Sequence, residues 1–252
     1  LRPDKCWWYL LDFKWHRNGT WKYATKKDSP GELVIPDHQL NEEQIERCEP
    51  HVGKETLGTY LAPDGNNVEQ LNKMTQDTKQ WAAQMKRGFM SKFSADLSVR
   101  TRIMKSLEYP TAAITLNETE CKTIMKIILN AALPKMGINR RAGHAYLYGP
   151  SRYQGLNFPN LYTEMCAHRL ITVMKHGGQP TQMGLSLLNC MEGHQLEIGT
   201  YQKMFDADIN TYGHLASDSL LSHTWRLLSD CGLRLETSHA VPVRLRVRDE
   251  AI

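Results

Sequence analysis

The sequence predicts an α+β protein that is mostly helical after residue 66, and three observations support this fold class. Apolar residues alternate with period two along residues 7–15, which is typical of a strand with one buried face. From residue 68 onward, apolar residues recur every three or four positions, which is typical of amphipathic helices. No apolar run approaches the roughly 20 residues that a membrane-spanning helix needs, so we expect no membrane partner.

The N-terminal segment predicts a β-hairpin over residues 5–24. Asn18-Gly19 predicts a two-residue turn, because both positions tolerate positive φ. The aromatic face of this hairpin could stack on bases. We prefer the interpretation that it packs against a part of the polypeptide upstream, so that the isolated chain exposes an apolar patch and aggregates. One face carries Trp7, Tyr9, Leu11, Phe13, Trp15, Trp21 and Tyr23.

Residues 26–50 are polar and rich in Pro and Gly, so we interpret them as a loop with one short strand at 32–35. A further strand is predicted at 56–61. It ends in the turn sequence Ala-Pro-Asp-Gly-Asn at 62–66, which predicts the start of a helix.

The middle third predicts a three-helix unit. Gly88 ends the first helix, and Pro110 and Pro134 limit the other two. Asn117 and Glu120 have the spacing of a capping box at the third helix. In the second helix Arg100 falls on the apolar side, where we expect an ion pair with Asp96 four residues earlier. The predicted helices cover residues 68–87, 94–107 and 117–133.

The last third is also mainly helical. A short strand is predicted at 145–148, and the alternating sequence VPVRLRVRD at 241–249 predicts a final strand. We divide the chain into residues 1–65, 66–135 and 136–252. The predicted helices of the last part cover residues 161–175, 180–191 and 217–229.

Charge and cysteine usage limit the function classes. The chain has 31 Lys and Arg against 27 Asp and Glu, a net charge of +4 that slightly favours an anionic partner. Its six cysteines are scattered without a CxxC pair, which favours reduced thiols and an intracellular protein of the cytoplasm or nucleus. Two Cys/His pairs suggest zinc, but we favour ordinary thiols and histidines, because structural zinc needs four converging ligands. These pairs are Cys166 with His168 and Cys190 with His194.

The segments LRPDKC at 1–6, TLGTYL at 56–61, LEYP at 107–110 and YGPSRYQGL at 148–156 together resemble parts of the reverse transcriptases of retrotransposon-type elements. LRPDKC at 1–6 resembles the stretch that follows the catalytic hairpin and ends the palm domain, and TLGTYL at 56–61 resembles the strand pair that forms the primer grip. LEYP at 107–110 and YGPSRYQGL at 148–156 resemble further segments of such polymerases from protist and algal genomes. The resemblance covers most of the chain, thinly after about residue 165.

The resemblance implies that the chain comprises the palm end, the thumb and a C-terminal module of an RNA-directed DNA polymerase. It implies a primer grip at Leu57, Gly58, Thr59 and Tyr60. Lys5 would lie near the leaving pyrophosphate, as a possible general acid. The start of the chain within a strand, without Met, fits a piece of a longer polypeptide whose upstream palm and fingers are partners.

The catalytic aspartates of the family are missing here. Polymerases of this family bind two Mg²⁺ ions through three palm aspartates, two of them in a Tyr-x-Asp-Asp hairpin. Phe205–Asp208 (FDAD) only superficially resembles this hairpin and lies far downstream of the thumb. We therefore expect no metal site and no cofactor in this chain, Mg²⁺ in the intact polymerase, and no polymerisation by this chain alone.

The first predicted thumb helix carries a polar stripe opposite its apolar face. Amides and cations on one face can contact the phosphates of a template–primer duplex without reading its sequence. Solvation alone would explain such a stripe in the absence of the resemblance. Two further alternatives stay open for the whole chain: a non-enzymatic module that binds nucleic acid or protein, and the remnant of a degenerate element. The stripe consists of Lys73, Gln76, Gln80, Gln84 and Arg87.

Overall fold

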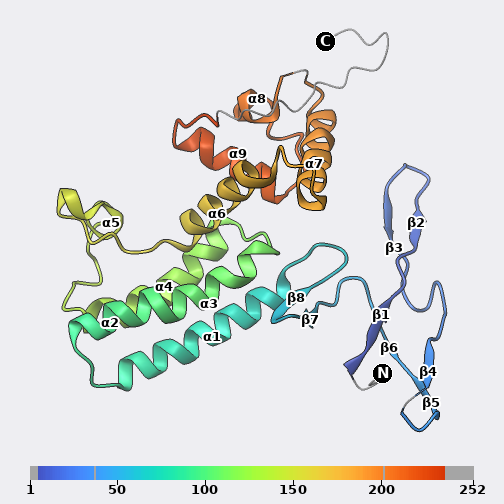
Figure 1. Ribbon diagram of the computed structural model, residues 1–252, viewed down its shortest axis with the longest axis horizontal. Helices are drawn as coiled ribbons and strands as arrows, with labels where there is room; N and C mark the ends of the chain where they lie inside the picture. The colour runs from blue at the N-terminus through green and yellow to red at the C-terminus, as the bar shows by residue number, and fades with distance from the viewer. Residues whose placement is uncertain (1–4, 37, 201, 236–252) are drawn as a thin grey trace. The chain divides into compact units, whose positions relative to one another are not determined.

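The computed structural model describes residues 5–36, 38–200 and 202–235 (Figure 1). Among these residues, short strands lie between Trp7 and Leu61 and helices between Val68 and Asp230, so the predicted α+β, mostly helical fold class is confirmed. The chain forms two compact units, residues 1–76 and 77–252. The domain boundaries after residues 65 and 135 stay predictions. The alternating C-terminal tail and the first four residues of LRPDKC lie outside the described residues.

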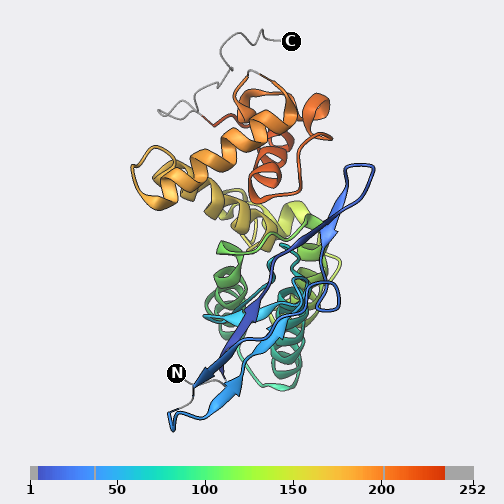
Figure 2. The same ribbon diagram turned by 90° about the vertical axis from the view of Figure 1, so that its right-hand side faces the viewer.

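The described residues of the first unit form four two-stranded sheets, drawn in blue to cyan in Figures 1 and 2. One of them is parallel and pairs strands far apart in the sequence, whereas the other three are antiparallel. The parallel pair is β1 (Trp7–Tyr9) with β6 (Glu46–Cys48). The antiparallel pairs are β2 (Phe13–Trp15) with β3 (Trp21–Tyr23), β4 (Val34–Pro36) with β5 (Glu42–Gln44), and β7 (Lys54–Thr56) with β8 (Thr59–Leu61).

The N-terminal hairpin is shorter than the sequence predicts, because β1 leaves it to pair with β6. The indole of Trp8 donates to the carbonyl of Ile45 at 3.3 Å, and the Tyr9 hydroxyl donates to the carbonyl of Val52 at 2.9 Å. The interpretation of residues 26–50 as loop was therefore wrong for β5 and β6. Both strands consist mainly of charged and polar residues, so no apolar alternation marks them.

The turn between β2 and β3 also differs from the predicted two-residue turn. Only Gly19 has a positive φ, at 83°, and its amide donates to the carbonyl of His16 at 3.0 Å. Asn18 instead uses its side chain to accept from the amide of Thr20 at 3.1 Å. This is a three-residue loop with a type I turn followed by a left-handed glycine.

The first three helices begin close to the predicted positions. Helix α1 spans Val68–Arg87, as predicted, and buries Met74, Trp81 and Met85. The second helical region begins two residues early and contains a π-helical turn at Val99–Ile103 between α2 (Lys92–Ser98) and α3 (Met104–Glu108). A 3₁₀ turn follows at Tyr109–Ala112.

Helix α4 (Glu118–Lys135) confirms the capping box of Asn117 and Glu120 but passes through Pro134. The prediction that it ends before Pro134 was wrong. A proline in the last turn removes only one intrahelical bond, and the amide of Met136 still donates to the carbonyl of Ala132 at 3.0 Å.

Residues 144–148 form a short helix, α5 (His144–Tyr148), so the strand predicted at 145–148 was wrong. The chain folds back over this helix, and the amide of Leu156 donates to the carbonyl of Tyr146 at 2.8 Å. A Cβ on Gly155 would lie 2.0 Å from the carbonyl oxygen of Gly149, so this fold-back requires glycine.

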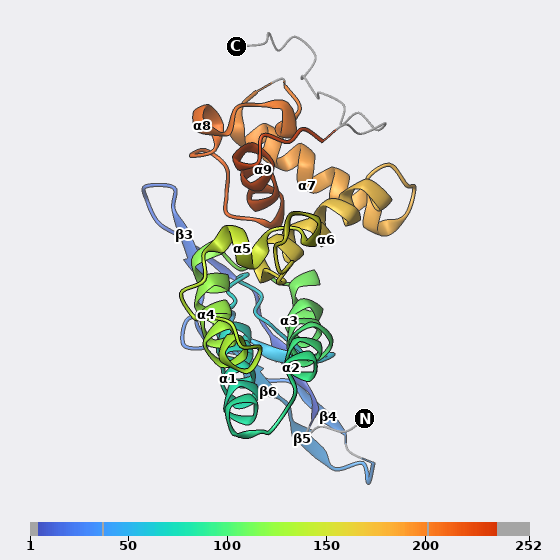
Figure 3. The same cartoon turned by 90° about the vertical axis from the view of Figure 1, so that its left-hand side faces the viewer.

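The remaining helices are α6 (Leu161–His176), α7 (Gln182–Ile198), α8 (Ile209–Tyr212) and α9 (Leu220–Asp230), shown in Figures 1 and 3. Helix α7 continues seven residues beyond its predicted end, as far as Gly199 with φ 69°. Helix α6 contacts α3, α4, α7 and α9, so it connects the helices of this unit. The core around its second half comprises Val173, Met191, Ile198, Met204, Ala207, Leu221 and Trp225.

Candidate nucleic-acid interface

The polar stripe predicted on α1 is exposed along its whole length. Lys73, Gln76, Gln80, Gln84 and Arg87 are all exposed, while the opposite face is buried. At 1.5 Å per residue the stripe is about 21 Å long, which is about six base-pair steps of 3.4 Å. The stripe therefore offers two cations and three amides at a spacing suited to a nucleic-acid backbone.

The single strand predicted at 56–61 was wrong, because residues 57 and 58 form a turn between β7 and β8; the predicted primer-grip residues lie in this turn and at the start of β8. Leu57 and Gly58 form this two-residue turn with φ of 51° and 80°, the pair of positive values that defines a type I′ turn. Leu57 is 88% exposed, whereas Thr59 is only 6% exposed. The hairpin thus presents an apolar tip, and Thr59 does not offer its side chain to a ligand. Tyr60 is half-buried.

The hairpin is fixed to the start of α1 inside the first unit. The amide of Tyr60 donates to Oε1 of Gln70, whose side chain is buried. Lys54 on β7 forms an ion pair with Glu46 on β6 at 2.6 Å, which lowers the pKa of Glu46 through that hydrogen bond. The hairpin is therefore attached to the start of α1, which also carries Lys73 and Gln76.

Lys5 is exposed and lies two residues before β1. Residues 1–4 of its motif fall outside the described residues, and no hydrogen bond or ion pair between described residues joins Lys5 to the hairpin or the stripe. In the described parts of the chain, no group of three or more His, Cys, Asp or Glu side chains could hold a metal ion. Cys166 is buried in α6 while His168 is exposed, so this pair does not form a common ligand face.

Sequence reasoning missed a polar cavity in the second unit, which we call the α4–α9 cavity. It has a volume of about 740 Å³ and is lined by side chains of α4, α5, α6 and α9 and of the loop after α4. Five separate parts of the chain supply its cations and aromatic rings, so no local motif could reveal it. The polar lining includes Lys122, Lys126, Arg140, Tyr148, Tyr162 and Arg226.

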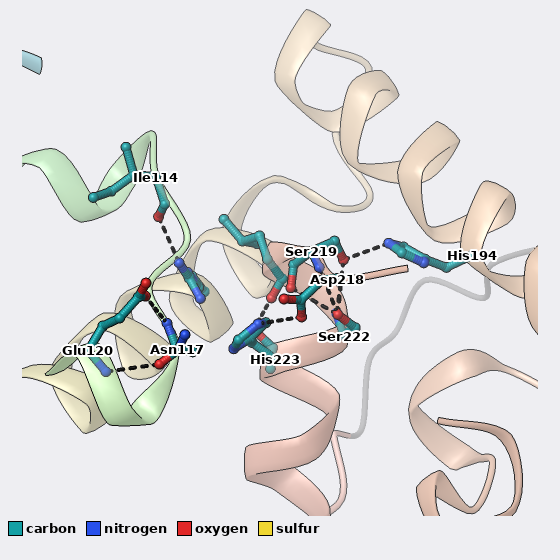
Figure 4. Close-up of polar contacts among 11 residues, drawn as sticks. Ile114, Asn117, Glu120, His194, Asp218, Ser219, Ser222 and His223 are labelled. Carbon is teal, nitrogen blue, oxygen red and sulfur yellow. Dashed lines mark hydrogen bonds and ion pairs between the residues drawn. The ribbon is translucent and has the colours of Figure 1, made fainter. Parts of the chain in front are cut away.

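A polar network next to this cavity joins α7 to α9 (Figure 4). Nε2 of His194 lies 2.6 Å from the Ser219 hydroxyl, and its Nδ1 lies 2.9 Å from a carboxylate oxygen of Glu197. Burial raises the pKa of Glu197, but hydrogen bonds from Ser217 and His194 outweigh burial and hold this pKa below its usual value. The Ser219 hydroxyl, the His194 imidazole and the Glu197 carboxylate thus lie in the order that is typical of a serine nucleophile, its histidine base and the acid that orients the base.

The Ser219 hydroxyl oxygen nevertheless stabilises the start of a helix. It accepts the amide of Ser222 at 3.1 Å and so caps α9, and the Ser222 hydroxyl accepts the amide of Ser219 in return at 2.9 Å. Beside it, buried His223 contacts Asp218 at 2.7 Å (Figure 4). These contacts orient the start of α9 and thereby one wall of the α4–α9 cavity.

No protein-family model, curated protein or solved structure matches the chain. No helix of the described residues is long and apolar enough to cross a membrane. Three separate features could contact nucleic acid: an exposed polar stripe on α1, an apolar hairpin tip in the first unit, and a cationic cavity in the second.

Proposed function

We propose that this chain is the part of a retroelement RNA-directed DNA polymerase that grips the primer and holds the template–primer duplex. The observation that supports this most strongly is the exposed stripe on α1, which begins in the same unit as the hairpin of Leu57 and Gly58. The hairpin contacts the primer strand, and the stripe contacts the phosphates and minor-groove edges of the duplex.

Binding by this surface is independent of base sequence. Lys73 and Arg87 neutralise phosphates, and the three glutamine amides donate to phosphate or sugar oxygens. Such contacts release counterions, so the affinity falls as the salt concentration rises. A duplex-holding surface needs this behaviour, because the polymerase must translocate over every sequence that it copies.

Nucleotidyl transfer itself is assigned to the upstream palm and fingers, with their Mg²⁺. The described residues do not provide a carboxylate cluster that fits this metal, and no step of the reaction is assigned to them. Lys5 is the one residue for which we propose a role near the pyrophosphate, as a general acid. The free cysteines fit a reducing compartment, so we place the protein in the cytoplasm or nucleus.

The duplex role is tested by equilibrium binding of a fluorescent RNA/DNA hybrid to the full chain. We expect Lys73→Ala/Arg87→Ala to weaken binding roughly tenfold, because two phosphate contacts are lost. The matched control is Lys79→Ala/Lys86→Ala, which removes the same charge from another exposed face of α1 and changes affinity much less. Equal losses in the two variants would contradict the role of the stripe.

The polymerase assignment has its own test, which is the coding sequence directly before Leu1. An in-frame Tyr-x-Asp-Asp within a few tens of codons, with a third Asp further upstream, supports it. An initiating Met just before Leu1, or replaced aspartates, overturns it. A duplex-binding module without polymerase activity would then be the better description.

A further inference from the structure

The α4–α9 cavity gathers cations that have no acidic partner. Lys126 lies on α4, Arg140 in the loop that follows it and Arg226 on α9, and none of the three forms an ion pair with any residue that the structure describes. Lys122, a fourth cation of the lining, pairs with Glu118 at 2.8 Å. The carboxylates of Glu118 and Asp230 also line the cavity, so four cations stand against two anions there, and the excess of positive charge favours an anionic ligand.

The starts of two helices add to this potential, whereas the buried Arg169 of α6 is not part of the cavity lining. The first turns of α4 and α6 both border the cavity, and helix N-termini carry partial positive charge. Arg169 of α6 is 3% exposed and donates only through Nη2, to the carbonyl of Ile114 at 2.8 Å. Its Nε and Nη1 have no hydrogen-bond partner within the described residues, so its charge is poorly compensated.

The cavity also has the groups that bind bases. Tyr148 and Tyr162 are half-buried in its lining, and the ring of Tyr148 lies edge-on to His144 with 5.7 Å between centroids. Burial raises the pKa of Tyr162 to about 12, and its hydroxyl contacts the Cys166 side chain, so the ring of Tyr162 is the part that can contact a base. Asn130 lines the same space, and its side-chain amide makes no hydrogen bond to a described residue.

We propose that the α4–α9 cavity binds an unpaired nucleic-acid strand, with its phosphates on Lys126, Arg140 and Arg226 and a base against Tyr148 or Tyr162. This deepens the proposed function, on which it rests: the strand would be the single-stranded template next to the duplex. Stacking rings within a cationic groove are the usual means of binding single strands.

The distribution of the cations favours a strand over other anions. Lys122 and Lys126 lie one helical turn apart on α4, and the other cations come from separate elements, so the charge extends along the cavity. A nucleoside triphosphate would need the cations of the cavity to lie close together around its triphosphate group. A duplex presents only its outer phosphates to a hollow of this size, whereas an unpaired strand can insert a base.

The test uses the full chain and four fluorescent ligands: a 12-nucleotide oligouridylate RNA, an oligothymidylate DNA of the same length, an RNA/DNA duplex and a fluorescent ATP analogue. The variant Lys126→Gln/Arg226→Gln removes two cavity cations. Lys175→Gln/Lys203→Gln removes two exposed cations elsewhere in the same unit and is the matched control. Circular dichroism verifies folding, and Asn130→Asp supplies a second variant that adds a negative charge inside the cavity without a change of size.

We expect the cavity variant and Asn130→Asp to weaken single-strand binding at least tenfold, with duplex affinity and the control changed less than twofold. Tighter binding of RNA than of DNA would identify RNA as the strand through its 2′-hydroxyls, and equal binding would identify either strand as an acceptable ligand. Photocrosslinks of the strand to peptides with Tyr148 or Tyr162 would place it in the cavity.

Three outcomes would overturn the inference. They are unchanged single-strand affinity in both cavity variants, an equal loss for the duplex, and binding of the ATP analogue as tight as binding of the 12-mer. Failure of the α1 variant to affect duplex binding would contradict the proposed function instead, because that variant leaves the cavity intact.

Discussion

The main-chain amide of Tyr60 donates a 2.7 Å hydrogen bond to Oε1 of Gln70, a side chain that is only 3% exposed. This bond joins strand β8 to the first turn of α1. It fixes the hairpin tip at Leu57 on the helix that carries the polar stripe. A buried amide that accepts a backbone donor is costly to replace, because the donor loses its partner.

We therefore expect Gln70→Ala to destabilise the first unit by about 1–3 kcal/mol. Urea denaturation followed by tryptophan fluorescence measures this loss. Gln80→Ala is the control on the same helix, because its side chain is exposed and its replacement changes stability by no more than about 0.5 kcal/mol. Equal effects of the two variants would show that the Tyr60–Gln70 bond does not stabilise the hairpin.

Leu57 combines a strained backbone with an exposed apolar side chain. A leucine with φ 51° costs about 1 kcal/mol relative to a residue that tolerates this region. Leu57→Asn should raise the free energy of unfolding by about that amount, because Asn adopts positive φ readily. The same variant should weaken duplex binding, since the tip loses its apolar contact.

A Leu57→Asn protein that is more stable but binds the duplex more weakly would show that Leu57 serves binding and not folding. Gly58→Ala is the companion variant, and it should destabilise the hairpin because φ is 80° there. A less stable Leu57→Asn protein, or one with unchanged duplex affinity, would argue against a functional tip.

Arg100 bridges the π-helical turn and the loop before α6. Its Nε contacts Asp96 at 2.9 Å, the predicted ion pair, and its terminal nitrogens donate to the carbonyls of Asn157 and Leu156. We expect Arg100→Met to cost about 1–3 kcal/mol, because two carbonyls lose their donor. Asp96→Asn should cost less than about 1 kcal/mol, since the pair is partly exposed. A larger loss of stability in urea denaturation for Asp96→Asn than for Arg100→Met would contradict this assignment.

Stability should also decrease at alkaline pH because of a buried thiol. Burial is the main cause that raises the pKa of Cys121 from 9.0 to about 12. The folded state therefore holds this proton more tightly than the unfolded state, so the stabilisation is complete below pH 9 and is lost as the pH rises toward 12. Midpoints of urea denaturation between pH 8 and 11 should fall more steeply for the wild type than for Cys121→Ala. The exposed Cys190→Ala should follow the wild type.

The sequence was sufficient for local features of the fold. The turn sequence at 62–66 and Gly88 placed the two ends of α1, and the Asn117–Glu120 spacing identified a capping box. The ion pair of Asp96 and Arg100 followed from their spacing of four. Each of these features depends on residues within one or two helical turns, so local rules apply to them.

Long-range pairing could not be predicted in this way. Strand β1 pairs with β6 across almost forty residues, and nothing in its local pattern distinguishes that partner from β3. Helix α5 was missed because its five residues are too short for helical periodicity to appear. The α4–α9 cavity depends on tertiary packing of four helices, and its cations looked like ordinary solvated charges in the sequence.

The central claim, that the α1 stripe holds a duplex through its phosphates, is tested most directly by the salt dependence of RNA/DNA hybrid binding. The logarithm of the association constant is measured against the logarithm of the salt concentration for the wild type, Lys73→Ala/Arg87→Ala and Lys79→Ala/Lys86→Ala. We expect the stripe variant to reduce the slope by about 2, because roughly 0.9 counterions are released per phosphate contact, and the control to keep the wild-type slope. Identical slopes for the two variants, or no hybrid binding by the wild type, would contradict the claim.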